Sequence, residues 1–318
     1  MRIAAVVLLL LFAAAAPAAA GRWLPGAAWP SRAPRAGITA WLAGSLSVAF
    51  SLVLSGLILA VPCLPAGADP AMLRACLALL RTQYASPAGA AAGLAGGALM
   101  MTVLGRVTWY YCSAAAAARR CRARHDEVLA IIARPGPATD VRIIDSGHPA
   151  VYCLPGRRRI VLTTATGALD CLDGGQLDAV LAHERAHLSG RHHLVLRLAA
   201  ALERAFSRVR FFAAAAEQVA YLVEVAADDA AARRAPRLTV AAALLAVAAA
   251  GIPAGSLGAG GSAAARRIER LIAPPLRGSR AQRAVACAAL AMVTVLAVTA
   301  VALAFSTIIR CPGASLSL

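Results

Sequence analysis

Four stretches of the chain are long and apolar enough to cross a lipid bilayer, and this feature constrains the fold more than any other. A spanning helix needs roughly 20 apolar residues. The four stretches are residues 3–20, 38–61, 87–105 and 284–309. A fifth, residues 238–251, is apolar but short, and we predict a buried core helix there. The sequence therefore predicts a mainly α membrane protein with about four transmembrane helices.

Composition agrees with a membrane protein that carries one polar insert. Of the 318 residues, 60% are hydrophobic and only 15% are charged, whereas a soluble domain has about a quarter charged residues. The net charge of +17 raises the question of a nucleic-acid partner. All 32 basic residues are arginine, however, and they cluster beside the apolar stretches. We therefore expect contact with the lipid bilayer and no direct nucleic-acid binding.

The first stretch has two interpretations, a transmembrane helix or a secretory signal peptide. It has a charged start, an apolar middle and small residues at its end, which suit both. Arg22, Arg32 and Arg35 follow at once. A cleaved signal peptide would deliver them outside the cell, against the positive-inside rule. We favour a transmembrane helix with its N-terminus outside.

The same arginine bias orients the remaining stretches in a multi-pass protein of the cell membrane. Arginines are dense after the third stretch and before the fourth, and sparse between the second and third stretches and after the fourth. We predict a membrane region at residues 1–112, a cytoplasmic domain at 113–283, and a last span with a short external tail at 284–318. Both termini are then outside.

Cysteines add little to this prediction. Those inside the cell form no CxxC pair, which argues against a cysteine zinc cluster. Those outside can form disulfides, and the sequence leaves open whether they do. The three external cysteines are Cys63, Cys76 and Cys311.

The insert carries the motif HExxH on a well-signalled helix. Asp173 is a predicted N-cap, and Gln176 completes a capping box with it. His183 and His187 are four residues apart, so both imidazoles project from one helix face. In a site of this kind the two histidines hold zinc, and Glu184 accepts a proton from the attacking water.

Zinc needs a third protein ligand, and an extended match to HExxHxxGxxH offers His193. That pattern is typical of metzincins, which also need a methionine turn downstream. The only methionine after Gly190 is Met292, inside the fourth apolar stretch. A helix is also predicted to start near His192, where the metzincin chain would turn. We expect His192 and His193 to lie just past the motif helix, solvated or near the bilayer.

A better third ligand lies in the alanine-rich segment "YLVEVAADDAAARR". Glu224 and Asp228 are four residues apart there, which is the gluzincin arrangement. We predict Glu224 as the third ligand, and Asp228 as the acceptor of a hydrogen bond that fixes the tautomer of His183. Asp229 points about 100° round the same helix, so we expect it to tolerate replacement by asparagine.

Two short strands precede the motif helix, in "HPAVYCLPGRRRIVLTT" around a Pro-Gly turn. In proteases of this kind a strand edge above the active helix pairs with the substrate backbone. Either residues 160–163 or the preceding strand can provide that edge, and a plain hairpin that covers the helix remains an alternative. The preceding strand contains Ala150, Val151, Tyr152 and Cys153.

The segment "AVYCLPGRRRIVLTTATGALDCLDGGQLDAVLAHERAH", followed by "EVAADDAA", resembles metallopeptidase family 56. This is the family of BlaR/MecR-type sensor-transducer membrane proteases, related to HtpX-type gluzincins. The segments "RAPRAGITAWLAG" and "ARRIERLIAPP" are also similar to its shorter members. The resemblance implies four spans and a cytoplasmic gluzincin-type α+β zinc domain inserted between the third and fourth. Its site matches His183, Glu184, His187 and Glu224, with Asp228 beside them.

The chain departs from the BlaR/MecR pattern at its end. No S-x-x-K or K-T-G motif follows the fourth stretch, and the chain has no lysine to build one. We therefore expect a short form that lacks the penicillin-binding sensor domain.

These patterns predict an integral-membrane zinc endopeptidase with one Zn²⁺ per chain and a protein substrate. The resemblance implies regulatory cleavage of a cytoplasmic repressor, and quality control of membrane proteins is the alternative. A catalytically idle scaffold and a metal-handling membrane protein are the rivals. A metal carrier is expected to have ionisable residues inside its spans, and the four stretches contain none.

Overall fold

The computed structural model describes residues 2–23, 26–27, 29–61, 70–136, 138–144, 150–154, 159–163, 172–251 and 259–273. The predicted fourth span, residues 284–309, lies outside this part of the chain. So do Cys63 and Cys311.

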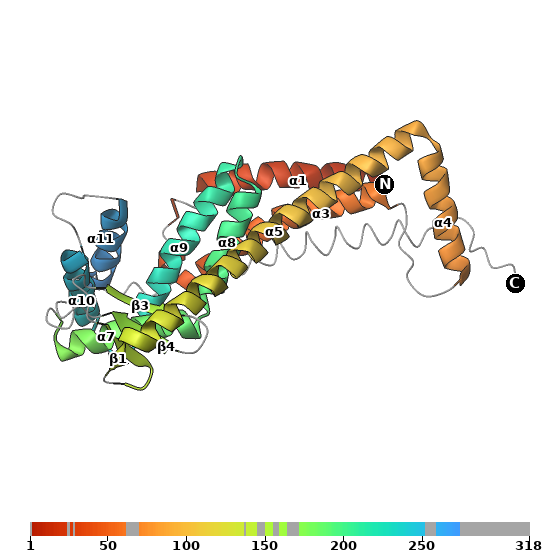
Figure 1. Ribbon diagram of the computed structural model, residues 1–318. Helices are drawn as coiled ribbons and strands as arrows, with labels where there is room; N and C mark the ends of the chain where they lie inside the picture. The colour runs from red at the N-terminus through yellow and green to blue at the C-terminus, as the bar shows by residue number, and fades with distance from the viewer. Residues whose placement is uncertain are drawn as a thin grey trace, which may run out of the picture.

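Three of the described helices are long and apolar enough to cross a membrane (Figure 1). The first and third predicted spans each lie within one of them, and the second does so except for Val61, which caps the end of its helix. The three helices are α1 (Arg2–Trp23), α3 (Pro34–Ala60) and α5 (Pro87–Ile132), and the shorter α2 (Trp29–Arg32) and α4 (Pro70–Ala85) lie between them. Val6 and Leu9 of α1 pack against Leu54 and Ile58 of α3, so the first helix joins the bundle.

Helices α3 and α5 cross closely because a glycine lies at the contact on each of them. A Cβ added to Gly56 would lie 2.5 Å from the carbonyl oxygen of Gly96. A Cβ added to Gly96 would lie 2.4 Å from the Cβ of Leu59. Small residues let two helix backbones approach in this way where no hydrophobic effect drives association.

Helix α4 closes the end of the bundle that lies away from the polar domain (Figure 1). The amide of Gln83 donates to the carbonyl oxygen of Leu59 at 2.9 Å, and the hydroxyl of Tyr84 donates to that of Ala60 at 3.0 Å. Both acceptors belong to the last turn of α3, whose carbonyls have no partner within the helix. Cys76 of α4 is disulfide-bonded.

Helix α5 extends well beyond the predicted third span. Ser86 caps its N-terminus through the amide of Gly89, and Pro87 occupies the first turn. Its 46 residues make it about 69 Å long, so the predicted boundary between residues 112 and 113 lies inside a continuous helix. The C-terminal end of α5 contacts the small sheet described next, because His125 Nε2 lies 2.7 Å from the hydroxyl of Tyr152 in one of its strands.

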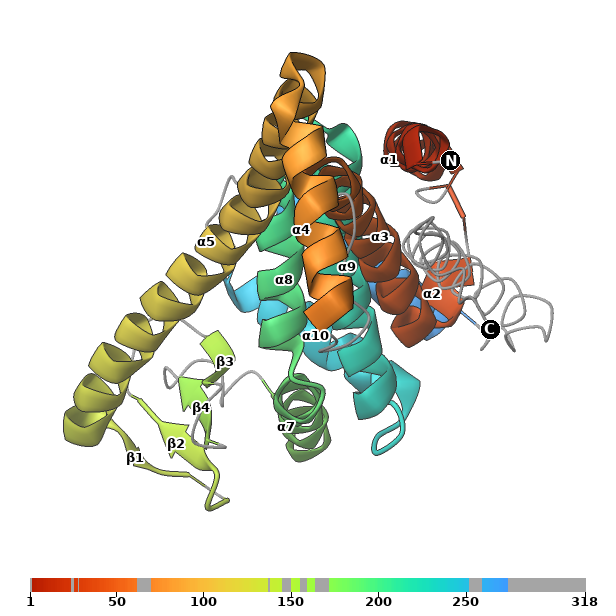
Figure 2. The ribbon, with the colours of Figure 1, turned by 90° about the vertical axis from the view of Figure 1, so that its right-hand side faces the viewer.

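A small sheet lies between the far end of α5 and helix α7 (Figure 2). The strand order is β1-β2-β4-β3, with β2 and β4 parallel and the other two pairs antiparallel. Strand β4 therefore has partners on both sides, whereas β3 is at an edge. The strands are β1 (Arg134–Pro135), β2 (Val141–Ile143), β3 (Ala150–Leu154) and β4 (Arg159–Thr163).

Five further helices complete the described part, and two of them join the polar domain to the membrane helices. They are α7 (Gly174–Ser189), α8 (His192–Ala205), α9 (Arg210–Ala231), α10 (Arg237–Gly251) and α11 (Ala259–Ile272). Helices α8 and α9 form a hairpin against α3 and α5 (Figure 2). Phe211, Phe212 and Leu222 of α9 are buried there with Trp41 of α3. The predicted helix from His192 is confirmed as α8.

The predicted core helix at residues 238–251 is also confirmed. It is α10, whose Val240 and Ala241 are buried against Ala179 of α7 and Leu271 of α11. On the opposite side of α7, Leu181 packs on Val141 of the sheet. The motif helix is thus held between α10 and the sheet.

The contact between α3 and α5 gives the first prediction. Replacing Gly96 with alanine pushes Leu59 and the backbone of Gly56, both on α3, away from α5, and such overpacking costs about 1–3 kcal/mol. We expect the G96A protein to unfold at a lower temperature than the wild type in detergent, measured by circular dichroism. Gly97 is the matched control, because an added Cβ meets only the Cβ of Ala60, at 4.0 Å. Equal destabilisation by G96A and G97A would contradict the close contact.

Candidate metal centre

The motif helix α7 begins as the sequence predicts. The carboxylate of Asp173 accepts from the amide of Gln176 at 2.7 Å, and the side chain of Gln176 accepts from the amide of Asp173 at 3.1 Å. This capping box is therefore confirmed. The capping box fixes the residue at which α7 starts. His183 and His187, four residues apart on that helix, both face α9.

Helix α9 presents two carboxylates to α7. Val223, Val225 and Ala227 have no exposed surface, so their burial orients the helix and leaves Glu224 and Asp228 on the side that faces the histidines. The side chain of Glu224 is 38% exposed and that of Asp228 only 1%.

His183, His187 and Glu224 form a group that can hold a metal ion. The Nε2 atoms of the two histidines are 3.0 Å apart. Glu224 Oε2 lies 3.4 Å from His183 Nε2, and Glu224 Oε1 lies 3.5 Å from His187 Nε2. Ligands about 2.0–2.1 Å from a tetrahedral zinc ion are about 3.3 Å from one another. The spacing and the two-nitrogen, one-carboxylate donor set therefore both fit zinc.

Asp228 lies directly behind this group. Its Oδ1 atom is 3.0 Å from His183 Nδ1 as an ion-pair contact, but His183 Nδ1 has no hydrogen-bond partner among the described residues, so the predicted hydrogen bond stays a prediction. A carboxylate at Nδ1 favours the tautomer with the proton on that atom, which leaves Nε2 with a lone pair towards Glu224.

Arg267 is a site residue that sequence reasoning missed. Its Nε and Nη2 atoms donate to the two carboxylate oxygens of Asp228, both at 2.7 Å, and its Nη1 lies 3.0 Å from Glu224 Oε2. It comes from α11, about 40 residues along the chain. The run "ARRIER" indicates topology and contributes to the family resemblance, but it does not by itself predict a contact with the site. A buried carboxylate such as that of Asp228 does require a cation, but the sequence does not say which arginine supplies it.

Asp229 is not the inert neighbour that the sequence suggested. Both its carboxylate oxygens pair with Arg270 of α11, at 2.8 and 3.0 Å. Arg270 also donates to the carbonyl oxygen of Ser31 in α2. Asp229 therefore ties three helices together, and its replacement by asparagine is expected to disturb α11.

The position of His193 does not support the metzincin interpretation, because His193 is not one of the three residues that can hold a metal ion together. His192 does reach the site, since its Nδ1 lies 3.0 Å from His187 Nδ1. The expectation that His192 is merely solvated or near the bilayer is thus wrong. Gly190 makes room for it, because an added Cβ would lie 2.4 Å from His192 Nε2. Arg191 takes the left-handed conformation at this turn, with φ of 48°.

Glu184 faces the edge strand β3. Burial raises the pKa of its carboxyl, partly opposed by the attraction of His183 and a hydrogen bond with Cys153. Because side chains alternate along a strand, Val151 and Cys153 turn to α7 and Tyr152 turns to α5. The strand thus places its backbone beside the predicted general base.

The charges in the site oppose one another strongly. Burial disfavours the ionised carboxyls of Glu224 and Asp228, but contacts with His183 and Arg267 outweigh it and lower the pKa of both. Burial also disfavours protonation of His183, yet the two carboxylates raise its pKa to about 9. For His187, burial prevails over the attraction of Glu224 and lowers the pKa to about 4.

A family model, peptidase family M48, matches residues 115–259. The matched segment contains α7 and α9, and with them every predicted site residue, but it ends before Arg267. A search of curated proteins and one of solved structures found no match. The match supports a metallopeptidase of family M48, and with the three apolar helices it supports a membrane-associated one. Families of this kind hold a metal, typically zinc.

The ligand group gives the second prediction. Replacing Glu224 with alanine removes one of three donors, so the purified protein is expected to lose bound zinc, measured by atomic emission. His193→Ala is the control and is expected to keep about one zinc per chain. Loss of zinc in the His193 variant together with its retention in the Glu224 variant would establish the metzincin arrangement instead.

Proposed function

We propose that the chain is an integral-membrane zinc endopeptidase that cleaves a protein substrate. The observation that carries this proposal is the meeting of His183, His187 and Glu224 beside Glu184 on a capped helix. The match of residues 115–259 to a metallopeptidase family model supports it. A catalytically idle scaffold gives no reason for a buried glutamate next to the donor group.

The residues have separate roles in this mechanism. His183, His187 and Glu224 would hold zinc, which when bound supplies a Lewis acid for the scissile carbonyl. Glu184 takes a proton from the attacking water and passes it to the leaving amine. Burial raises the pKa of Glu184 above that of a solvated carboxyl, which makes it a stronger base for this step. Asp228 and Arg267 hold His183 and Glu224 in place.

The substrate is proposed to bind along β3. This strand is at the edge of the sheet and lies against α7, whereas β4 is paired over residues 160–162 with both neighbours. An extended segment added to β3 would run beside Glu184, with backbone hydrogen bonds that are independent of its sequence. The edge strand therefore favours residues 150–153 over 160–163 as the substrate strand.

The finer family, BlaR/MecR-type metallopeptidase family 56, is proposed on the resemblance of the sequence alone. It implies cleavage of a cytoplasmic repressor, whereas an HtpX-like role implies membrane-protein quality control. Both roles use the same site and the same chemistry, so the tests below concern the site and the topology.

The third prediction separates catalysis from metal binding. Glu184→Gln keeps the shape of the side chain and removes the base, so we expect bound zinc to be retained. Cleavage of quenched fluorescent casein is expected to fall by about 10²–10⁴-fold, the usual contribution of a general base. Glu217→Gln, at an exposed position of the same α9 that bears Glu224, is the control and should cleave normally. Undiminished cleavage by purified E184Q protein would contradict the proposed role of Glu184 as general base.

The proposed topology places the metal centre in the cytoplasm and α4 outside. The arginine bias of the sequence supports it. So does the state of the described cysteines, because Cys76 of α4 is disulfide-bonded while Cys112, Cys121 and Cys153 are free. Disulfides persist outside the cytoplasm and thiols inside it.

The fourth prediction tests this orientation. An alkaline phosphatase fused after Ser86, between α4 and α5, is expected to be active because it is exported. The same enzyme fused after Ala235, between α9 and α10, is expected to stay in the cytoplasm and to be inactive. A fluorescent protein fused at that position is expected to be fluorescent. The opposite pattern would reverse the orientation and restore the signal-peptide interpretation of the first helix.

A further inference from the structure

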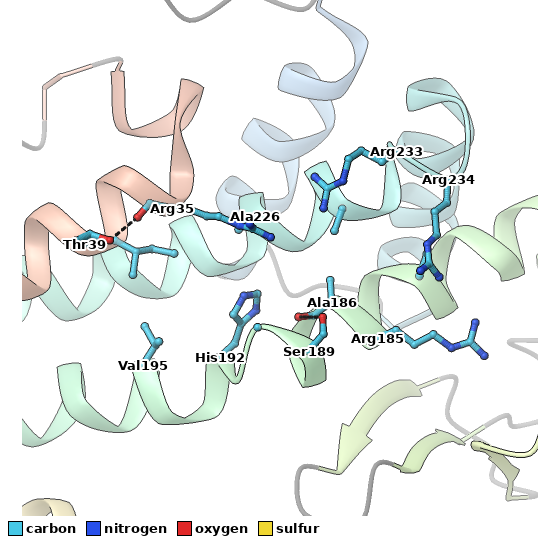
Figure 3. A pocket seen from close by; sticks show the side chains of 14 residues that line it. Arg35, Thr39, Arg185, Ala186, Ser189, His192, Val195, Ala226, Arg233 and Arg234 are labelled. Atoms are coloured by element: carbon cyan, nitrogen blue, oxygen red, sulfur yellow. Dashed lines mark hydrogen bonds between the residues drawn. The ribbon is translucent and has the colours of Figure 1, made fainter. Parts of the chain in front are cut away.

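A pocket of about 610 Å³ lies on the side of α7 away from the sheet. The start of α3, the end of α7, the start of α8 and the end of α9 surround it (Figure 3), and Arg185 extends from the pocket towards the sheet, where it pairs with Asp140. None of the predicted site residues lines it.

The pocket is distinct from the proposed substrate edge. The residues of α7 that line the pocket lie on one face of the helix. His183, Glu184 and His187 lie on another face, and the angle about the helix axis between a lining residue and one of these three is about 100° or more in most cases. The lining residues of α7 include Ala182, Arg185, Ala186 and Ser189. A peptide on β3 would therefore run on the other side of the helix.

Charge is the main property of the pocket. Four arginines line it, and no aspartate or glutamate is among its lining residues in the described part of the chain. Arg185 is paired with Asp140, at 2.9 Å for both contacts, and Arg233 donates to the carbonyl oxygen of Asp229. Arg35 and Arg234 are exposed, and their guanidinium groups have no hydrogen bond or ion pair within the described residues.

One further feature adds to this positive field. Arg35 lies in the first turn of α3, whose N-terminus carries partial positive charge from the helix dipole. The hydroxyls of Ser189 and Thr39 also line the pocket, but each donates its proton to a carbonyl oxygen of its own helix, so the arginines are the donors. A guanidinium fork is well suited to the oxygens of a phosphate group.

The position of the pocket indicates where such a phosphate comes from. Arg35, Ile38 and Thr39 of its lining lie at the start of α3, one of the three candidate membrane spans. Helix α8, which supplies Val195, carries Arg197 on its other face, and the guanidinium of Arg197 lies 5.6 Å from the centre of the Tyr111 ring. Trp109, two residues before Tyr111, is 71% exposed. Exposed aromatic side chains at the end of a spanning segment mark the membrane interface, where lipid headgroups lie.

We propose that this pocket binds the phosphate of an anionic phospholipid headgroup, with Arg35 and Arg234 as its principal contacts. A soluble phosphate ester has the same anionic chemistry and is the other source of that group. The principal contacts, Arg35 and Arg234, are not in the proposed catalytic group, whereas His192 of the lining lies 3.0 Å from His187 and so places the pocket beside the metal centre.

The test measures binding of short-chain phosphatidylglycerol to the purified full-length protein in neutral detergent, by native mass spectrometry. Each arginine near an anionic lipid contributes enough that loss of two weakens binding about 30-fold. We therefore expect the double variant R35Q/R234Q to bind about 30-fold more weakly than the wild type. R35K/R234K, which keeps both charges, is expected to retain most of the affinity.

The matched control removes two equally exposed arginines outside the pocket, in R119Q/R208Q. This variant has the same net charge as R35Q/R234Q and is expected to bind the lipid within about threefold of the wild type. Zinc content and thermal midpoint, measured on every variant, show that the fold is intact independently of lipid binding.

Three results would overturn the proposal. Equal weakening by R35Q/R234Q and R119Q/R208Q would show only a general attraction of net charge. Equal affinity of the wild type for phosphatidylglycerol and for zwitterionic phosphatidylcholine would show that the anion is not recognised. Displacement of the lipid by an acidic peptide but not by glycerol 3-phosphate would identify a peptide site. Equal affinity for glycerol 3-phosphate and the lipid would support the phosphate site and assign it to a soluble ester.

Discussion

The described site depends on the burial of Asp228 between His183 and Arg267. A carboxylate that is 1% exposed is costly unless partners of opposite charge compensate it. Arg267 supplies two hydrogen bonds to it and a contact to Glu224 as well. The pairing therefore docks α11 on α9 and at the same time fixes the two side chains that face the donor atoms of the histidines. Without that cation, α9 would present two repelling carboxylates to the motif helix.

Helix α9 connects the candidate metal centre to the membrane helices, because it contacts both. One of its faces carries Glu224 and Asp228, and another packs Phe211 and Leu222 against Trp41 of α3. Helix α5 makes a second connection, because it runs unbroken from the membrane contact at Gly96 to His125 beside the sheet. The donor group and the edge strand are thus each attached to a candidate membrane span. A displacement of α3 against α5 would be transmitted to both.

Local patterns in the sequence were sufficient to predict many of the helices and several residues of the candidate site. Apolar stretches predicted the helices that contain the first three spans, because length and hydropathy are properties of a segment by itself. The capping box and the i, i+4 spacing of His183 and His187 are equally local, so they were predictable from neighbouring residues. Glu224 was predictable because a carboxylate among buried apolar residues of one helix needs a reason to be there. The fourth span stays a prediction, since it lies outside the described residues.

The sequence by itself thus determined which helices form, where the motif helix starts, and which residue types can hold a metal. Only the tertiary structure decided which partners complete the site. Arg267, His192 and the pairing of Asp229 with Arg270 depend on how α11, α8 and α9 pack, and many arginines in the chain are equivalent by sequence. The choice of β3 over β4 as the free edge depends likewise on strand order. Contacts between segments distant in the chain are fixed by packing and charge neutralisation in three dimensions, which no local spacing encodes.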